Sequence, residues 1–240
     1  MGSKHRDGAQ APETCAPEVR GPHEVRTARM RARLIQGAIE CLYGGGYSSA
    51  TTLNVQRRAG VSRGALLHHF STRADLLIAV AEHIIAEQTA FYIDELERIG
   101  DARERYVQIT AIAWEALKKP SGMALLEILM GCRRDPEMSE RFSLVAREVT
   151  RFQRAGMWIL AKNAGLSDRA AVIRANDLCL GALRGLSVQR LYDDDPQATE
   201  RGVEMLLAWL GRWLDEAVPA GDERAPREVT PFPPLPSRRF

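Results

Sequence analysis

Apolar residues recur every three or four positions along most of the chain between about residue 25 and residue 218, and this spacing is typical of amphipathic α-helices. The sequence contains no sustained alternation of apolar and polar residues, which would indicate a half-buried strand. We therefore predict an all-α protein with about nine helices. The two ends, residues 1–24 and 219–240, are rich in Pro, Gly and charged residues and lack this periodicity, so we expect disordered tails there.

Turn and cap residues divide the periodic region into short and long helices. A first helix over about 26–43 meets three glycines at 44–46, which should end it because glycine tolerates the left-handed backbone of a helix C-cap. Two short helices follow at about 53–59 and 63–70, and longer ones at about 73–98, 101–118, 121–134, 137–164, 168–192 and 197–217. The N-caps that we predict are Thr51 or Thr52, Ser62, Ser167 and Asp195, and the string from Thr72 to Asp75 resembles a capping box.

Charge is distributed unevenly along the chain. Residues 20–75 hold nine arginines against three acidic residues, a balance of +6, and because the whole chain carries +2 the remainder carries −4. A basic first quarter suggests that a polyanion meets one end of the molecule, although a basic solvated surface would give the same count. The chain has no secretory signal and no stretch of about 20 uncharged apolar residues, so we expect a cytoplasmic protein without membrane association.

The two short helices and the turn between them fit the helix-turn-helix pattern. The apolar residues that would pack these helices onto each other and onto the first helix are Val55, Ala59, Val61, Leu66 and Phe70. The second short helix would then expose Arg63, Gly64, Leu67 and His68. Small residues at Gly64 and Ala65 would let its backbone approach base edges in the major groove of DNA, from which larger side chains would hold it away.

One segment is more specific than this general pattern. The strings LIQGAIECLYGGGYSSATT and AGVSRGALLHHFSTRADLL, within residues 26–77, closely resemble the N-terminal domain of the TetR family of bacterial transcriptional regulators. The resemblance implies a helix-turn-helix DNA-binding domain at residues 25–71. It also implies a larger helical domain for ligand binding and dimerisation at residues 72–218. Beyond Leu77 only helix count and chain length support this part of the resemblance.

The resemblance also assigns residues to DNA. It implies that Thr52 contacts a phosphate and that Arg73 takes the place of a phosphate-binding lysine. The DNA-contacting residues that we expect are Thr52, Arg63, Gly64, Ala65, Leu67, His68, His69 and Arg73. Leu67 stands where the family often has a tyrosine that reaches a phosphate. Because leucine cannot donate a hydrogen bond, either an apolar contact to a thymine methyl group replaces that contact or the contact is absent.

The adjacent histidines could instead begin a metal or catalytic site. His68 and His69 point about 100° apart on a helix, and no Cys or acidic residue lies three or four positions away, so we predict no metal site. The four cysteines lie far apart and are expected to be free thiols. A helical enzyme is disfavoured, because repeated Glu-x-x-His pairs, a phosphate-binding loop and a nucleophile elbow are missing. We predict no cofactor.

Together with these features, the family resemblance implies a homodimeric repressor that binds a palindromic operator in double-stranded DNA and is released by a small, largely apolar effector. Two copies are expected because one helix-turn-helix reads too few base pairs to select a site in a genome. The helix that begins at residue 73 joins the two domains, so an effector that favours a tilted position of this helix would change the half-site spacing. The alternative is a DNA-binding regulator or activator that senses no small molecule.

The last two helices are apolar on more than one side and therefore need two partners. Two such helices from each chain would form a four-helix dimer bundle, as the family resemblance also implies. The other interpretation is that they fill the core of a single chain. The dimer residues that we expect are Leu180, Leu183, Leu206, Trp209, Leu210 and Trp213.

An effector cavity, mostly apolar with a few polar anchors, is expected among the middle helices. Its candidate residues are Trp114, Met123, Leu126, Glu127, Met130, Phe152 and Trp158. For each apolar member taken alone, plain core is the favoured interpretation over a cavity wall. Glu127 could anchor a cationic or hydroxylated effector, but its spacing of seven residues from Pro120 and from Arg134 favours a solvent-exposed stripe.

Overall fold

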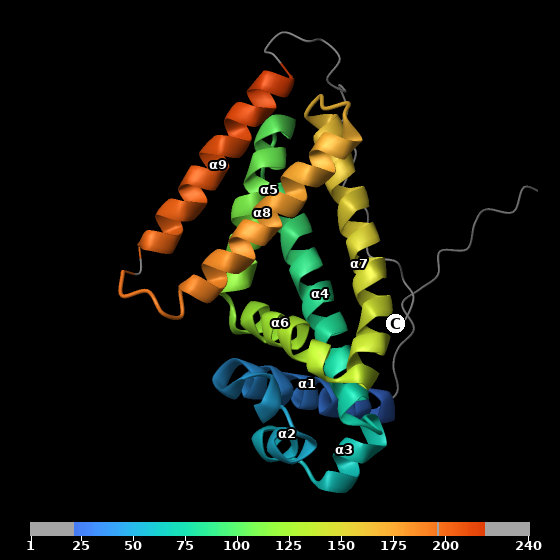
Figure 1. Ribbon diagram of the computed structural model, residues 1–240. Helices are drawn as coiled ribbons and strands as arrows, with labels where there is room; N and C mark the ends of the chain where they lie inside the picture. The colour runs from blue at the N-terminus through green and yellow to red at the C-terminus, as the bar shows by residue number, and fades with distance from the viewer. Residues whose placement is uncertain (1–21, 196, 219–240) are drawn as a thin grey trace, which may run out of the picture.

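The computed structural model describes residues 22–195 and 197–218, and within these ranges it contains nine α-helices, one short 3-10 helix and no strand (Figure 1). The elements are α1 (Pro22–Ser49), α2 (Thr52–Ala59), α3 (Arg63–His69), α4 (Arg73–Glu97), α5 (Ala102–Lys118), α6 (Pro120–Gly131), η1 (Cys132–Arg134), α7 (Pro136–Asn163), α8 (Arg169–Gln189) and α9 (Ala198–Ala217). Figure 1 shows α1, α2 and α3 gathered at one end, with α4 leading from them into the larger group. The prediction of an all-α fold with about nine helices is confirmed.

Local hydrogen bonds set the geometry of α2 and α3. The hydroxyls of Thr51 and Ser62 cap these helices, because each accepts a hydrogen bond from a backbone N–H of the first turn, at 3.2 Å in both cases. Between the helices, Gly60 has a φ of 62°, a left-handed conformation that glycine adopts without the clash of a Cβ. The residues expected to pack the two helices together are buried or half-buried, as predicted: Val55, Ala59, Val61, Leu66 and Phe70.

The ends of α1 differ from the prediction. α1 begins at Pro22, four residues earlier than expected, so the last residues of the predicted N-terminal tail are helical. The rest of that tail and the predicted tail at 219–240 lie outside the described residues. The three glycines do not all end the helix: the chain stays helical through the first two and breaks at Gly46, where φ is 72° and ψ is −173°. Only this position needs the positive φ that glycine permits.

Two of the predicted N-caps are wrong. Asp168, rather than Ser167, caps α8, because its carboxylate accepts hydrogen bonds from two backbone N–H groups of the first turn at 2.9 and 3.0 Å. Gln197, rather than Asp195, occupies the N-cap position of α9 and makes no side-chain capping bond. The Asp195 carboxylate instead accepts a hydrogen bond from the Gln197 N–H at 2.9 Å, which orders the turn before α9.

α4 connects the two groups of helices, and a capping box fixes its N-terminus. The Thr72 hydroxyl accepts a hydrogen bond from the Asp75 N–H at 3.0 Å, and the Asp75 carboxylate accepts one from the Thr72 N–H at 2.9 Å, so the predicted box is confirmed. By length and mean hydropathy, α4 is apolar enough to cross a membrane, a property that core helices share. Its packing against α1, α5, α6 and α7 accounts for this apolar character.

The buried core crosses the boundary between the N-terminal helices and the rest of the molecule. One cluster combines side chains of α1, α2, α3 and α4 with Ile128 of α6 and with Met138 and Phe142 of α7. Two further clusters join α5, α7, α8 and α9, with Leu126 of α6 in one of them. The helix-turn-helix therefore shares its core with α6 and with the start of α7.

Candidate nucleic-acid interface

α3 anchors itself through Leu66, which has no exposed surface, and presents a row of exposed residues. These are Arg63, Gly64, Leu67 and His68, in the orientation that the helix-turn-helix spacing predicted. Leu67 is 44% exposed, so its isobutyl group is free to contact an apolar group of another molecule. A thymine methyl group in the major groove is a contact of this kind.

Neither the packing nor the backbone conformation of α3 requires a glycine at position 64. A Cβ built at this position would meet no atom within 4 Å, and Gly64 is not among the described glycines with positive φ. Inside a helix, glycine costs about 0.5–1 kcal/mol of stability relative to alanine. A glycine that the protein interior does not require, in the first turn of an exposed helix, is consistent with close approach of another molecule to the α3 backbone.

His68 and His69 lie side by side at the end of α3, with ring centroids 5.3 Å apart in an edge-to-face arrangement. His68 is exposed and His69 is half-buried. Burial lowers the pKa of His69 below its ordinary value, and the neighbouring charges of His68 and Arg31 lower it further. These surroundings therefore favour the neutral form of the His69 ring. Within residues 22–195 and 197–218, no group of three or more His, Cys, Asp or Glu side chains is placed to hold a metal ion.

The remaining residues predicted to contact DNA lie near the starts of α2, α3 and α4. Thr52 is the first residue of α2 and is half-buried, as is Ala65 in α3. Arg73, the first residue of α4, is largely engaged inside the protein, because its guanidinium donates hydrogen bonds to the carbonyl oxygens of Ala50 and Tyr47 at 2.9 and 2.6 Å. These bonds tie the start of α4 to the end of α1 and to the residue that follows it. Arg73 therefore has a structural role at the start of α4. A contact between Arg73 and a DNA phosphate stays a prediction.

Tyr47 lies at the centre of a polar cluster that joins α1 to α6 and α7. Its ring lies under the Arg73 guanidinium, 4.2 Å from the ring centroid, and its hydroxyl donates to the Asp135 carboxylate at 3.2 Å. Asp135 also pairs with Arg73 at 3.4 Å. The Tyr47 N–H donates to the Glu127 carboxylate at 3.0 Å. Glu127 therefore faces the end of α1 rather than an effector or the solvent. Its spacing along the sequence did not predict this contact, because Glu127 and Tyr47 lie 80 residues apart.

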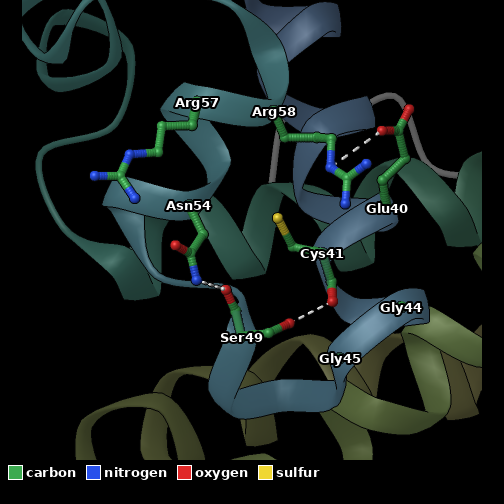
Figure 2. Close-up of a pocket in the computed structure, with 8 residues that line it drawn as sticks. All are labelled: Glu40, Cys41, Gly44, Gly45, Ser49, Asn54, Arg57 and Arg58. Atoms are coloured by element: carbon green, nitrogen blue, oxygen red, sulfur yellow. Dashed lines mark hydrogen bonds and ion pairs between the residues drawn. The ribbon is translucent and has the colours of Figure 1, made fainter.

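A hollow of about 560 Å³ lies between α1 and α2 (Figure 2). Its lining consists of Glu40, Cys41, Gly44, Gly45, Ser49, Asn54, Arg57 and Arg58. The Asn54 amide donates to the Ser49 carbonyl oxygen at 2.9 Å, and Arg58 pairs with Glu40 at 3.7 Å. Burial raises the pKa of the Cys41 thiol, so this group is not an activated nucleophile. Asn54 and Arg58 therefore join α1 to α2 across this hollow.

A second cavity, about 70 Å³ in volume, lies between α4, α5, α7 and α8. Its lining consists of Tyr92, Ile109, Thr110, Ala113, Gln153, Met157, Asn176, Cys179, Leu180 and Leu183. Half of these side chains are apolar, and the other half supply a phenol, a hydroxyl, a thiol and two amides. Burial raises the pKa of Tyr92 to about 12, so its hydroxyl stays protonated and can donate a hydrogen bond. The lining therefore combines apolar surface with several groups that can form hydrogen bonds.

The seven residues predicted to bind an effector do not line this cavity, and the structure does not gather them in one place. Trp114, Met123 and Leu126 belong to one buried cluster. Glu127 contacts the end of α1, and Met130 is exposed at the surface. Phe152 and Trp158 lie on α7, outside the cavity lining. Periodicity identifies apolar faces, but it does not tell which of them surround empty space. An effector contact by any of these residues stays a prediction.

α8 and α9 pack against each other, and the predicted dimer residues on them fall into two groups. Leu183 and Leu210 are 1% and 2% exposed within the single chain and leave almost no surface for a partner. The half-buried members are Leu180, Leu206, Trp209 and Trp213. Two exposed apolar residues outside the predicted set, Leu178 at 55% and Met205 at 70%, lie on the same helices. A dimer through α8 and α9 stays a prediction.

The chain is similar in sequence to known regulatory proteins. The profile of the bacterial regulatory proteins of the tetR family matches residues 34–80, which run from within α1 into α4. The HTH-type transcriptional regulator CymR of Pseudomonas putida is 30% identical over 178 residues, which cover 73% of this chain and 86% of CymR. The HTH-type transcriptional repressor AcnR of Corynebacterium diphtheriae is 30% identical over 112 residues, 47% of this chain and 55% of AcnR.

Solved structures share the fold. A transcriptional regulator from Rhodococcus sp. Rha1 matches with a TM-score of 0.63 at 21% identity, over 78% of this chain and 97% of that chain. A protein from Saccharomonospora viridis, solved in complex with choline, matches with a TM-score of 0.60 at 18% identity, over 76% and 96% of the two chains. The long sequence match to CymR goes beyond likeness of fold. The chain therefore belongs to the TetR family of bacterial regulatory proteins and is a regulator rather than an enzyme.

Proposed function

We propose that the protein is a cytoplasmic transcriptional repressor that binds a palindromic DNA operator as a homodimer and is released by a small, largely apolar effector. The exposed face of α3 carries the proposal, since its backbone is bare at Gly64 and its neighbours Arg63 and His68 are free to reach base edges or phosphates. The descriptions of CymR as a regulator and of AcnR as a repressor support it.

A homodimer is proposed because one copy of α3 covers only a few base pairs, too few to single out one site in a genome. Two copies related by a twofold axis would place two α3 helices in successive turns of the major groove. The exposed Leu178 and Met205 on α8 and α9 support a partner surface on these helices. Such a dimer would cover apolar side chains that water surrounds in the single chain.

The cavity between α4, α5, α7 and α8 is the proposed effector site. Its volume of about 70 Å³ is smaller than the roughly 150 Å³ of a cavity that accepts benzene. An effector must therefore widen it by displacing helices. α4 forms one wall through Tyr92 and begins at Arg73 beside α2, so this displacement would move the elements that hold α3. The choline complex of the Saccharomonospora viridis protein supports small-molecule binding in this fold.

The small size of the cavity also favours a second candidate, a DNA-binding regulator that senses no small molecule. The two candidates differ in the response of the protein to a broad panel of small apolar compounds. A compound that raises the melting temperature and lowers the DNA affinity supports the effector-released repressor. A panel that raises the melting temperature with some compounds but never changes the DNA affinity supports the second candidate.

The DNA-binding part of the proposal is tested by selecting duplexes from a randomised pool with the purified protein. We expect an inverted repeat to be enriched and to bind at least about 10³-fold more tightly than random duplex at the same salt concentration. Equal affinity for the selected and random duplexes would contradict the proposal.

A further inference from the structure

A groove of about 1070 Å³ lies where the N-terminal helices meet the larger domain. One wall is the end of α1 with the segment that follows it, and it includes Ser48 and Thr51. The other wall is the end of α6, η1 and the start of α7, and it includes Arg133 and Arg134. A molecule bound in this groove would touch both parts of the protein.

Two carboxylates line the groove, and both are already engaged. Asp135 pairs with Arg73, accepts a hydrogen bond from the Tyr47 hydroxyl and, through its other oxygen, accepts a backbone N–H of α7 at 3.1 Å. Glu127 accepts the N–H of Tyr47. Since Arg73 balances one of these two negative charges, Arg133 and Arg134 leave the groove with an excess of positive charge.

Arg133 and Arg134 are exposed, and neither forms an ion pair or a side-chain hydrogen bond with any residue in the described ranges. Both belong to η1, a single turn held between α6 and the Asp135 cap of α7. The turn therefore keeps two unpaired guanidinium groups beside the groove. Guanidinium groups bind phosphate oxygens in a two-point geometry, which makes a polyanion a suitable partner.

The wall formed by the end of α1 and the segment that follows it favours the DNA backbone as this polyanion. Thr51 leads directly into Thr52, the residue through which α2 is proposed to contact the DNA backbone. The first turn of α2 contains no acidic residue, and its backbone N–H groups carry partial positive charge. A DNA strand carries a phosphate about every 3.4 Å along the helix axis, so a strand that touches Thr52 has further phosphates on either side of it.

We propose that Arg133 and Arg134 extend the DNA interface beyond the helix-turn-helix by contacting phosphates of the strand that Thr52 contacts. This inference rests on the proposed function. It gives the larger domain its own contacts with DNA. A movement of α6 and of the start of α7 then removes DNA contacts directly, in addition to any effect that passes through α4.

The test is the salt dependence of affinity for a random duplex, because phosphate contacts do not depend on sequence. The variant Arg133→Ala/Arg134→Ala is compared with the full-length wild type. The matched control, Lys162→Ala/Arg169→Ala, removes the same charge from exposed positions at the junction of α7 and α8, at the opposite end of the molecule from α1 (Figure 1). A third variant, Arg133→Lys/Arg134→Lys, keeps the charge.

We expect the slope of log affinity against log salt concentration to become shallower by about 1.8 per chain in the alanine variant, or about 0.9 for each lost contact. The control and the lysine variant should keep the wild-type slope. Because both arginines are exposed, all variants should melt at the wild-type temperature.

A wild-type slope in the Arg133→Ala/Arg134→Ala variant overturns the inference while leaving the proposed function intact. An equal change in the Lys162→Ala/Arg169→Ala control also overturns it, because the effect would then follow net charge rather than position. If the wild-type protein itself binds no duplex DNA, the proposed function fails and the inference fails with it.

Discussion

At the scale of single residues, Gly64 gives the most direct test of the proposed DNA interface. Its side chain is a single hydrogen atom, it lies on the exposed face of α3, and no part of the protein occupies the space where a Cβ would stand. The residue therefore weakens the helix without improving any internal contact. Stability and DNA affinity should respond to a change at this position in opposite directions.

Gly64→Ala should raise the free energy of unfolding by up to about 1 kcal/mol, because alanine restricts the unfolded chain and favours the helix. It should lower the affinity for the selected operator by about tenfold or more, because a methyl group would hold α3 away from the base edges. Chemical denaturation and fluorescence anisotropy measure the two quantities. Gly44→Ala, at another exposed helical glycine with open space around it, is the control and should gain stability without losing affinity. Unchanged operator affinity in Gly64→Ala would contradict close approach at α3.

His69 should make stability depend on pH. Its pKa is lowered in the folded protein by burial and by the neighbouring charges of His68 and Arg31, so the unfolded chain binds a proton more readily. The contribution of His69 to the free energy of unfolding is present above the unfolded pKa of about 6.5, and it is lost as the pH falls from that value through the lower pKa of the folded protein. Denaturation between about pH 5.5 and 7.5 measures this loss. His69→Gln, which cannot take up the proton, should show a smaller loss, and an equal loss in both proteins would contradict the assignment.

At the scale of elements, the end of α1 is joined to the end of α6 by close contact as well as by hydrogen bonds. The Tyr47 ring packs on the backbone of Gly131, so closely that a Cβ at Gly131 would lie 2.0 Å from Cγ of the ring. The same ring lies under Arg73, which holds the start of α4 against the segment before α2. This joint fixes α2 and α3 relative to the larger domain.

Gly131→Ala should displace the Tyr47 ring and lower the free energy of unfolding by about 1–3 kcal/mol, the usual cost of overpacking. DNA affinity should fall as well, because α2 and α3 lose their fixed position. Tyr47→Phe keeps the ring but removes the hydroxyl that donates to Asp135, so its effect should be smaller. Chemical denaturation measures the free energy of unfolding of both variants, and fluorescence anisotropy measures their DNA affinity. If Gly131→Ala were as stable as the wild type, the close packing of the Tyr47 ring on Gly131 would be contradicted.

At the scale of the whole molecule, the features that local rules determine were predictable from the sequence. The capping box at Thr72 and Asp75, the turn at Gly60 and the burial of Leu66 each depend on residues a few positions apart. The position of the break at Gly46 was not predictable in this way, because three adjacent glycines tolerate the same angles and only tertiary contacts decide which one adopts a positive φ.

Features that depend on distant pairs were not predictable. Glu127 contacts Tyr47 across 80 residues, and the helical periodicity around Glu127 contains no sign of it. Leu183 and Leu210 satisfy the pattern of a partner surface, yet the single chain already buries them. The cavity beside Tyr92 is a small gap left by the packing of four helices, and the identity of its lining depends on how those helices cross.

The central claim is that two chains insert their α3 helices into successive turns of the major groove on one face of the same duplex. A hydroxyl-radical footprint on the selected operator, combined with the mass of the complex in solution, tests this claim most directly. The account predicts two chains on the duplex and two protected half-sites whose centres lie about 10 base pairs apart, or a multiple of that distance. A single protected stretch bound by one chain would contradict it.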